Sequence, residues 1–199
     1  LLHWRAEADR VDGEVLMALP IARSRDEAHL YLDLHPCERC HRSDVDWQDA
    51  LTHDDGAPAR RYFGVCPGCG EQREFTFRLP EKPALPGPDD LVFFGGPEHS
   101  QLFDAGEWRM IADAAIQEGS APSDSHTRDE RRRAFALGVA ALGEVLKFIP
   151  EGVDAVPESA FWTPHGRAAY EENPRRFERG YLTRWLETFQ DEMTARFRD

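Results

Sequence analysis

Two short stretches, Cys37-Glu38-Arg39-Cys40 and Cys66-Pro67-Gly68-Cys69-Gly70, contain all four cysteines of this 199-residue chain. Each stretch has two cysteines separated by two residues, and 25 residues lie between the two pairs. In the second stretch, Pro67 fixes one backbone angle of a turn, and its two glycines can adopt the positive φ of a tight loop. In the first stretch, His41 stands where a glycine is usual. The spacing predicts two turns whose sulfur atoms converge on one centre.

Four thiolates at tetrahedral angles form a preferred coordination shell of zinc, with metal–sulfur bonds of about 2.3 Å. We therefore predict one zinc ion with four cysteine ligands: Cys37, Cys40, Cys66 and Cys69. A shell closed by four thiolates has no open position for a substrate, so we predict a structural metal rather than a catalytic one. Replacement of one cysteine ligand by His35 or His41 is an alternative that the sequence leaves open.

Two other uses of the cysteines fit the sequence less well. Disulfide bonds would need an oxidising compartment, and the first residues do not resemble a signal peptide, so we expect a cytoplasmic location. A redox-active pair normally opens a helix after a strand, and neither pair has that context. The chain also lacks the run of about 18 apolar residues that would predict a membrane span.

The residues around the second cysteine pair favour β-strands. Residues 61–65 lead into the turn, and residues 74–79 alternate apolar and polar side chains, as a half-buried strand does. We predict a further short strand over residues 44–48 and a hairpin turn over residues 53–58, with Asp-Gly at its core. Together with the cysteine pairs, residues 34–80 resemble a zinc ribbon. This resemblance implies a structural metal site, but zinc ribbons occur in transcription factors, nucleases and ribosomal proteins, so it does not specify a function.

The rest of the chain shows helical patterns. Residues 3–19 and a second segment capped at Ser24 predict a helical hairpin before the first cysteine pair. Four prolines make residues 81–90 a predicted linker. Beyond the linker, the predicted helices cover residues 104–119, 127–149, 164–172 and 173–197. We thus expect an α+β protein with a helical hairpin and zinc ribbon in residues 1–80 and a mainly helical domain, packed on the first, in residues 91–199.

Acidic residues outnumber basic ones throughout the first part of the chain. The whole sequence has 37 acidic and 24 basic residues, a net charge of −13. Residues 1–119 contain 23 of the acidic and only 12 of the basic residues. A surface that binds nucleic acid must present cations to the phosphates, so this imbalance makes nucleic acid the less favoured partner. An acidic surface instead accelerates association with a basic protein.

These features predict a non-enzymatic protein-binding module with a structural zinc. One form is an immunity or antitoxin-like protein that neutralises a basic toxin or nuclease. The candidate partner-binding residues are Asp54, Asp55, Trp185 and Phe189. One alternative is a nucleic-acid-binding regulator that uses the arginines of the ribbon hairpin, which are Arg60, Arg61, Arg73 and Arg78. Another is an enzyme with a site assembled from distant residues, although no nucleophile–histidine pattern or nucleotide-binding motif indicates one.

Overall fold

The computed structural model describes residues 18–88, 90–121 and 126–198. Contacts divide the chain between Ala84 and Leu85 into two compact units, which we call the N-terminal unit and the C-terminal unit. The fold is α+β, with the sheet in the N-terminal unit and most helices in the C-terminal unit. The helix predicted over residues 3–19 falls almost wholly outside the described residues, so the helical hairpin stays a prediction.

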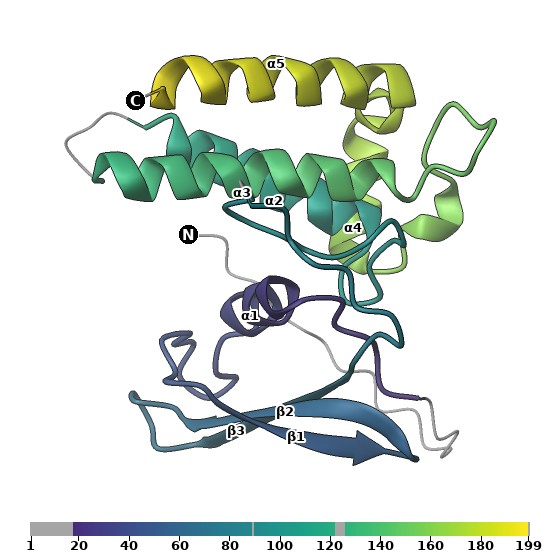
Figure 1. Ribbon diagram of the computed structural model, residues 1–199. Coiled ribbons are helices and arrows are strands. Elements are labelled where there is room, and N and C mark those ends of the chain that lie inside the picture. The colour runs from purple at the N-terminus through teal and green to yellow at the C-terminus, as the bar shows by residue number, and fades with distance from the viewer. Residues whose placement is uncertain (1–17, 89, 122–125, 199) are drawn as a thin grey trace. The chain divides into compact units, whose positions relative to one another are not determined.

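The described residues of the N-terminal unit form one helix and one three-stranded sheet. Helix α1 (Arg25–Leu34) covers one face of the antiparallel sheet, whose strands follow the order β1-β2-β3 (Figure 1). The strand bounds are Gln48–Asp54 for β1, Ala57–Val65 for β2 and Gln72–Arg78 for β3. This sheet ends, at one side, directly beside the two cysteine pairs, since Cys66 follows β2.

The turn between β1 and β2 follows the prediction. Asp55 and Gly56 connect the strands with φ values of 48° and 81°, so both central residues are in the left-handed region that a two-residue hairpin turn requires. The strand predicted over residues 44–48 is wrong, since β1 begins only at Gln48. The preceding residues pass over Gly64 instead, where a Cβ atom would lie 2.6 Å from Val45 Cγ1. Close packing against β2 therefore replaces strand pairing there.

Local capping and an aromatic core hold α1 on the sheet. Ser24 Oγ accepts a hydrogen bond from the Glu27 amide at 3.0 Å, which confirms the predicted N-cap. Tyr31 of α1 makes edge-to-face contacts with Phe75 and Phe77 of β3, at centroid distances of 5.8 and 5.4 Å. Such ring pairs add to the free energy gained by burying apolar surface. The N-terminal unit thus has its own core.

The C-terminal unit is helical. Its α-helices are α2 (Ala105–Gly119), α3 (Arg128–Leu146), α4 (Pro164–Glu172) and α5 (Arg179–Phe197), with short 3₁₀ helices η1 (Glu158–Ala160) and η2 (Pro174–Phe177). Helix α3 packs against α2 and α5, and α2 also packs against α4 (Figure 1). The largest fully buried side chains of this core are Trp108, Phe103, Phe135, Phe161, Phe177, Leu142 and Leu182. In the described part of the chain, none of the helices combines the length and the apolar character of a membrane span.

The start of the last helix differs from the prediction. Asn173 and Pro174 begin the 3₁₀ helix η2, and α5 starts only after Glu178. The predicted continuous helix over 173–197 is therefore wrong. The interruption has a tertiary cause, because the Arg179 amide donates a hydrogen bond to the carbonyl of Asp154 at 2.7 Å. This contact holds the chain in an extended conformation between the two helices.

Candidate metal centre

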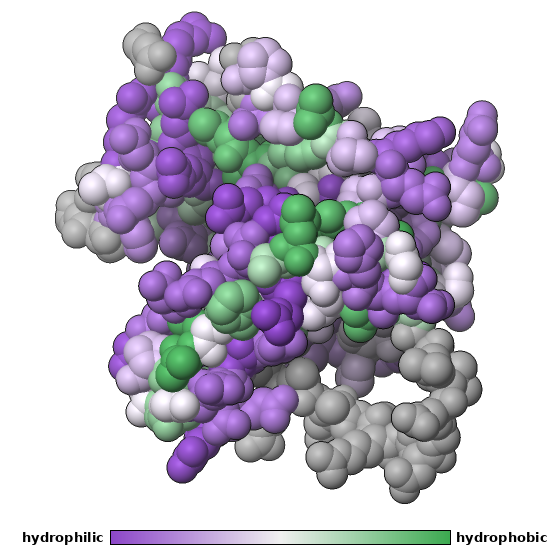
Figure 2. Space-filling model, turned by 60° about the horizontal axis from the view of Figure 1, so that its bottom comes forward, coloured by the Kyte–Doolittle hydropathy of each residue, from purple (hydrophilic) through white to green (hydrophobic). Residues whose placement is uncertain are grey.

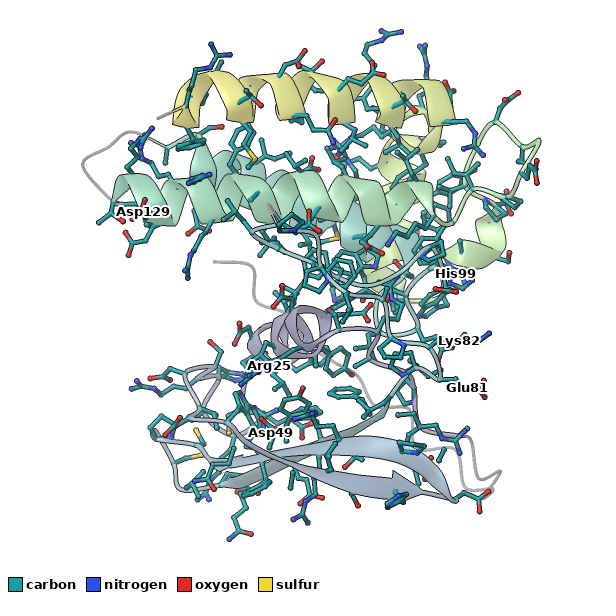
Figure 3. The ribbon with its side chains drawn as sticks, viewed as in Figure 1. Arg25, Asp49, Glu81, Lys82, His99 and Asp129 are labelled. Carbon is teal, nitrogen blue, oxygen red and sulfur yellow. The ribbon has the colours of Figure 1, made fainter. Side chains whose placement is uncertain are left out.

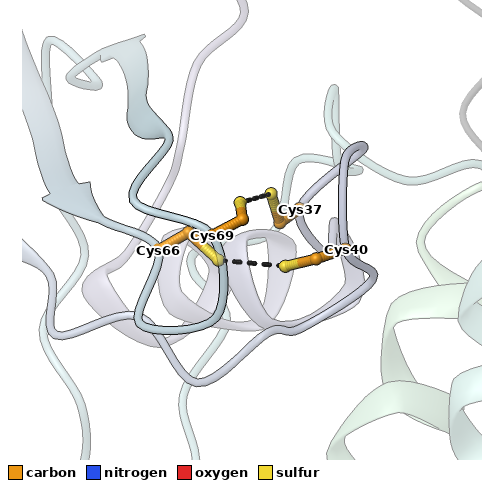
Figure 4. Close-up of side chains that lie close together, drawn as sticks. All are labelled: Cys37, Cys40, Cys66 and Cys69. Carbon is orange, nitrogen blue, oxygen red and sulfur yellow. Dashed lines mark hydrogen bonds between the residues drawn. The ribbon is translucent and has the colours of Figure 1, made fainter.

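The four cysteine side chains gather at one point of the N-terminal unit. All four Sγ atoms lie within 4.8 Å of one another, and they form a group that could hold one metal ion. The Sγ atoms of Cys37 and Cys69 are 3.6 Å apart, and those of Cys40 and Cys66 are 3.3 Å apart (Figure 4). Each short distance joins one cysteine of the first pair to one of the second. The two loops therefore place their four sulfur atoms around a common centre.

Both cysteine loops have the same backbone hydrogen bonds. In the first loop, the Cys37 amide donates to the carbonyl of Arg42 at 2.7 Å, and the His41 amide donates to the carbonyl of Cys37 at 2.7 Å. In the second loop, the amide of Cys66 donates to the carbonyl of Glu71 at 2.8 Å, and the amide of Gly70 donates to the carbonyl of Cys66 at 2.9 Å. The donors and acceptors have equivalent positions in the two loops, so the two loops are structural repeats.

The two loops also share a positive backbone φ angle at the residue four positions after their first cysteine. Gly70 has a φ of 75°, and His41 at the equivalent position has a φ of 59°. A positive φ costs a residue with a side chain about 1–2 kcal/mol, whereas glycine adopts it freely. The first loop therefore has the same shape as the second despite its less suitable residue.

The environment of the cysteines lowers the pKa of Cys66. Cys37 and Cys66 are buried, whereas Cys40 and Cys69 are partly exposed. Burial acts to raise the pKa of Cys66, but hydrogen bonds from Cys40 and from the amides of Gly68 and Cys69 lower that pKa to about 6. Thiolate is the form of cysteine that binds metals. The lowered pKa favours the thiolate form of Cys66, which is the form that a metal ion would bind.

His35 and His41 are not part of the sulfur cluster. Nδ1 of His35 lies 2.7 Å from the backbone oxygen of Tyr31, and its ring stacks on the Tyr31 ring at 3.7 Å. Burial lowers the pKa of His35, although its hydrogen bond to Tyr31 acts in the opposite direction. The His41 side chain is exposed. The group that could bind a metal consists of the four cysteines.

The arginines of the hairpin are not on one surface. Arg60 and Arg61 are neighbours in β2, so their side chains leave opposite faces of the sheet. Arg73 and Arg78 are likewise on opposite faces of β3, because they are five positions apart in the strand. Arg60 forms an ion pair with Asp49, and Arg61 forms one with Glu74. Arg73 donates a hydrogen bond to the carbonyl oxygen of His35, and Arg78 forms an ion pair with Asp54. Asp49 also lies 3.9 Å from Arg25 of α1 (Figure 3).

The residues predicted to contact a partner occur in both units. Asp54 accepts a hydrogen bond from Arg78 Nε at 2.7 Å, whereas Asp55 is exposed at the tip of the β1–β2 hairpin. Trp185 and Phe189 lie on α5, where they line a cavity that also contains Arg109. Sequence reasoning missed Arg109, because nothing local to that residue signals a site.

Comparisons of the chain with models of protein families, with curated proteins and with solved structures found no match. We therefore infer the function from the geometry and chemistry of the residues themselves.

Proposed function

We propose that the four cysteines bind one structural zinc ion in a zinc-ribbon arrangement. A tetrahedral centre with metal–sulfur bonds of about 2.3 Å places its sulfur atoms about 3.8 Å apart. The sulfur separations of 3.6 and 3.3 Å support this size. Four thiolates leave no vacant coordination position, so the ion would stabilise the loops and the adjacent sheet rather than activate a substrate. Thiolate ligands also favour zinc over magnesium or calcium.

Metal analysis of the purified full chain tests the proposal for zinc. We expect one zinc per chain by native mass spectrometry and no visible absorption. Iron also accepts four thiolates, but it gives a coloured protein. A coloured, iron-containing protein would therefore contradict the assignment of zinc, and a metal-free protein with a cooperative N-terminal unit would contradict a structural role.

We further propose that the protein is a non-enzymatic module that binds a basic protein, in the manner of an immunity or antitoxin-like protein. The observation that supports this proposal is that the hairpin arginines pair with acceptor groups of the N-terminal unit itself. Because each of them contacts a carboxylate or carbonyl of its own unit, these cations are engaged internally, within a chain of net charge −13. Hydrophilic side chains cover much of the face shown in Figure 2.

Electrostatic association gives this proposal a clear signature. A basic partner would bind an acidic surface with an association rate that falls as salt screens the charges. We would capture the tagged, zinc-loaded chain from host lysate in 50 mM salt and identify the bound molecules by native mass spectrometry. We would then measure association of the purified partner at about 50 and 300 mM salt, two conditions chosen to bracket the physiological screening length.

The outcome of this capture separates the candidate functions. A stoichiometric basic protein whose association slows at high salt would support the proposal. Captured RNA or DNA would instead favour a nucleic-acid-binding regulator, and Arg61 on the exposed side of the sheet would become the first residue to replace. Binding of a basic partner without any salt dependence would contradict the electrostatic basis of the proposal.

A further inference from the structure

The C-terminal unit has a cavity that the metal centre does not explain. Its volume is about 490 Å³, within the range of sites for small organic ligands. The side chains that decide its chemistry come from α2, η2 and α5, and they are Arg109, Asp113, Arg176, Tyr181, Trp185 and Phe189. The cavity therefore combines two arginines, the carboxylates of Asp113 and Glu172, and an aromatic wall within a single unit.

Arg109 is the unusual member of this lining. Its side chain is 6% exposed, and one of its nitrogens, Nη2, lies 2.8 Å from Asp113 Oδ1. Its Nε and Nη1 atoms are buried and have no hydrogen-bond partner among the described residues. The guanidinium carbon lies 6.0 Å from the centre of the Tyr181 ring. The face of that ring has no oxygen atom that could accept a hydrogen bond from Arg109. Buried donors without acceptors are rare in folded proteins and destabilise them, so these two nitrogens point to a missing acceptor.

The charges around Arg109 indicate what the acceptor is. Arg176 forms an ion pair with Oδ2 of Asp113, while Arg109 contacts Oδ1 of the same carboxylate. Two guanidinium groups thus share one carboxylate, which leaves an excess of one positive charge. Glu172 also lines the cavity, but its carboxylate is exposed to water, whose high dielectric constant weakens its attraction to the two arginines. One negative charge on a ligand would balance the pair of arginines.

An aromatic wall runs along the α5 side of the cavity. Tyr181, Trp185 and Phe189 recur every fourth residue on α5. The ring centroids of Tyr181 and Trp185 are 6.0 Å apart, and those of Trp185 and Phe189 are 5.1 Å apart with an interplanar angle of 26°. All three side chains are half-buried, so part of each ring remains accessible. A flat ring could stack against this wall.

We propose that this cavity binds a small aromatic monocarboxylate. The ligand's carboxylate can accept a hydrogen bond from an N–H group of Arg109 that has no partner among the described residues, and its ring matches the aromatic wall. A carboxylate supplies the single negative charge that the two arginines lack, whereas a phosphate monoester would bring up to two into an already acidic chain. This inference concerns the C-terminal unit alone, and it stands whether or not the protein binds a basic partner.

Benzoate is the probe that tests the proposal. We would titrate it into the zinc-loaded full chain and follow the side-chain N–H signal of Arg109 by NMR, together with saturation transfer from protein to ligand. Benzyl alcohol has the ring without the charge, and phenyl phosphate has the ring with a different anion. We expect saturable benzoate binding, a shift of the Arg109 signal, and affinities for the other two compounds at least tenfold lower.

Substitutions within and beside the cavity complete the test. Arg176→Gln and Trp185→Leu remove a cation and part of the aromatic wall, and each should weaken benzoate binding about tenfold or more. Arg175→Gln is the matched control, because Arg175 is 86% exposed and is not part of the cavity lining. Circular dichroism would verify that each variant is folded.

Several results would overturn the proposal. These are the absence of benzoate binding at millimolar concentration, equal affinity for benzyl alcohol, tighter binding of phenyl phosphate, and unchanged benzoate affinity in both Arg176→Gln and Trp185→Leu. An equal loss of affinity in Arg175→Gln would also contradict it, because a general charge effect would then account for the binding.

Discussion

Asp104 and Thr163 join the starts of two helices that are 59 residues apart in the chain. Asp104 Oδ2 accepts one hydrogen bond from the Thr163 amide and another from Thr163 Oγ1, each at 2.8 Å. Asp104 is the N-cap of α2, and Thr163 is the N-cap of α4. Gly166 is also required at this contact, because a Cβ atom there would overlap the Asp104 carboxylate. One fully buried carboxylate therefore fixes the α2–α4 packing.

We predict that Asp104→Ala destabilises the C-terminal unit by about 3 kcal/mol or more. The substitution removes an N-cap worth about 1 kcal/mol, and it leaves the two partly buried donors of Thr163 without their acceptor. Thr127→Ala is the matched control, because Thr127 caps α3 with the same capping box but is exposed. This control should cost about 1 kcal/mol. Urea unfolding of the full chain, followed by NMR signals of α2 amides, measures both, and equal losses would contradict the role given to the Thr163 contact.

Glu107 makes the stability of the C-terminal unit depend on pH. Burial disfavours its charged form and the nearby Asp104 repels it, so the pKa of Glu107 is raised to about 8 from an ordinary value of 4.5. A carboxyl group whose pKa is higher in the folded state stabilises the fold fully below about pH 4.5. This contribution decreases as the pH rises toward 8. We therefore predict that the free energy of unfolding falls over this range, by at most about 1.4 kcal/mol per pH unit from this group.

Glu107→Gln isolates this effect, because the amide keeps the shape and an acceptor oxygen but does not titrate. The variant should show a smaller decrease in stability between pH 5 and 8 than the unaltered protein. The measurement is the urea midpoint of the α2 amide signals at pH 5, 6.5 and 8. Parallel pH profiles for the two proteins would show that Glu107 does not cause the dependence.

Features set by neighbouring residues could be predicted from the sequence. Asp104 and Thr127 each have a glutamate three residues later, and both capping boxes form as expected. Pro164 stands at the first position of α4, as its fixed φ predicts. The two C-x-x-C pairs likewise come together, because metal-ligand spacing is a local signal in each loop. In all these cases the interacting groups lie within a few residues, or the residue type itself is diagnostic.

Features set by distant contacts could not be predicted. The break before α5 depends on Asp154, whose carbonyl accepts a hydrogen bond from the Arg179 amide. The cavity depends on Asp113 and Arg176, which are 63 residues apart. The sequence analysis predicts Trp185 and Phe189 as partner-binding residues, but no pattern in the sequence connects them to a buried arginine. Tertiary packing determines these features, and one sequence does not reveal it.

We predict that Cys69→Ser abolishes metal binding and most of the stability of the N-terminal unit. A serine hydroxyl is not deprotonated at neutral pH, so it cannot replace a thiolate in the shell, and metal binding and folding are coupled in such sites. Ser43→Ala is the control, since Ser43 is an exposed residue of the first loop and is not part of the sulfur cluster. Thermal unfolding and metal content would be measured together. Unchanged unfolding of Cys69→Ser would refute a structural role for the centre.

The equivalent loop positions of His41 and Gly70 allow a paired substitution test. Gly70 has a positive φ, and a Cβ atom there would meet nothing within 4 Å, so Gly70→Ala adds backbone strain without crowding. We predict that Gly70→Ala destabilises the metal-loaded N-terminal unit by about 1 kcal/mol. His41→Gly should relieve the same strain in the first loop, but the added freedom of glycine in the unfolded chain offsets part of the gain.

We therefore expect His41→Gly to stabilise the unit slightly, by less than about 1 kcal/mol, because the strain of about 1–2 kcal/mol exceeds the entropic loss of about 0.5–1 kcal/mol. The exposed His41 side chain contributes no burial that its removal would forfeit. Chelator competition and thermal unfolding of the zinc-loaded full chain would report both variants. Opposite signs for the two substitutions are the expected result. If both destabilise the unit equally, the His41 side chain stabilises the first loop in a way that its backbone angle does not explain.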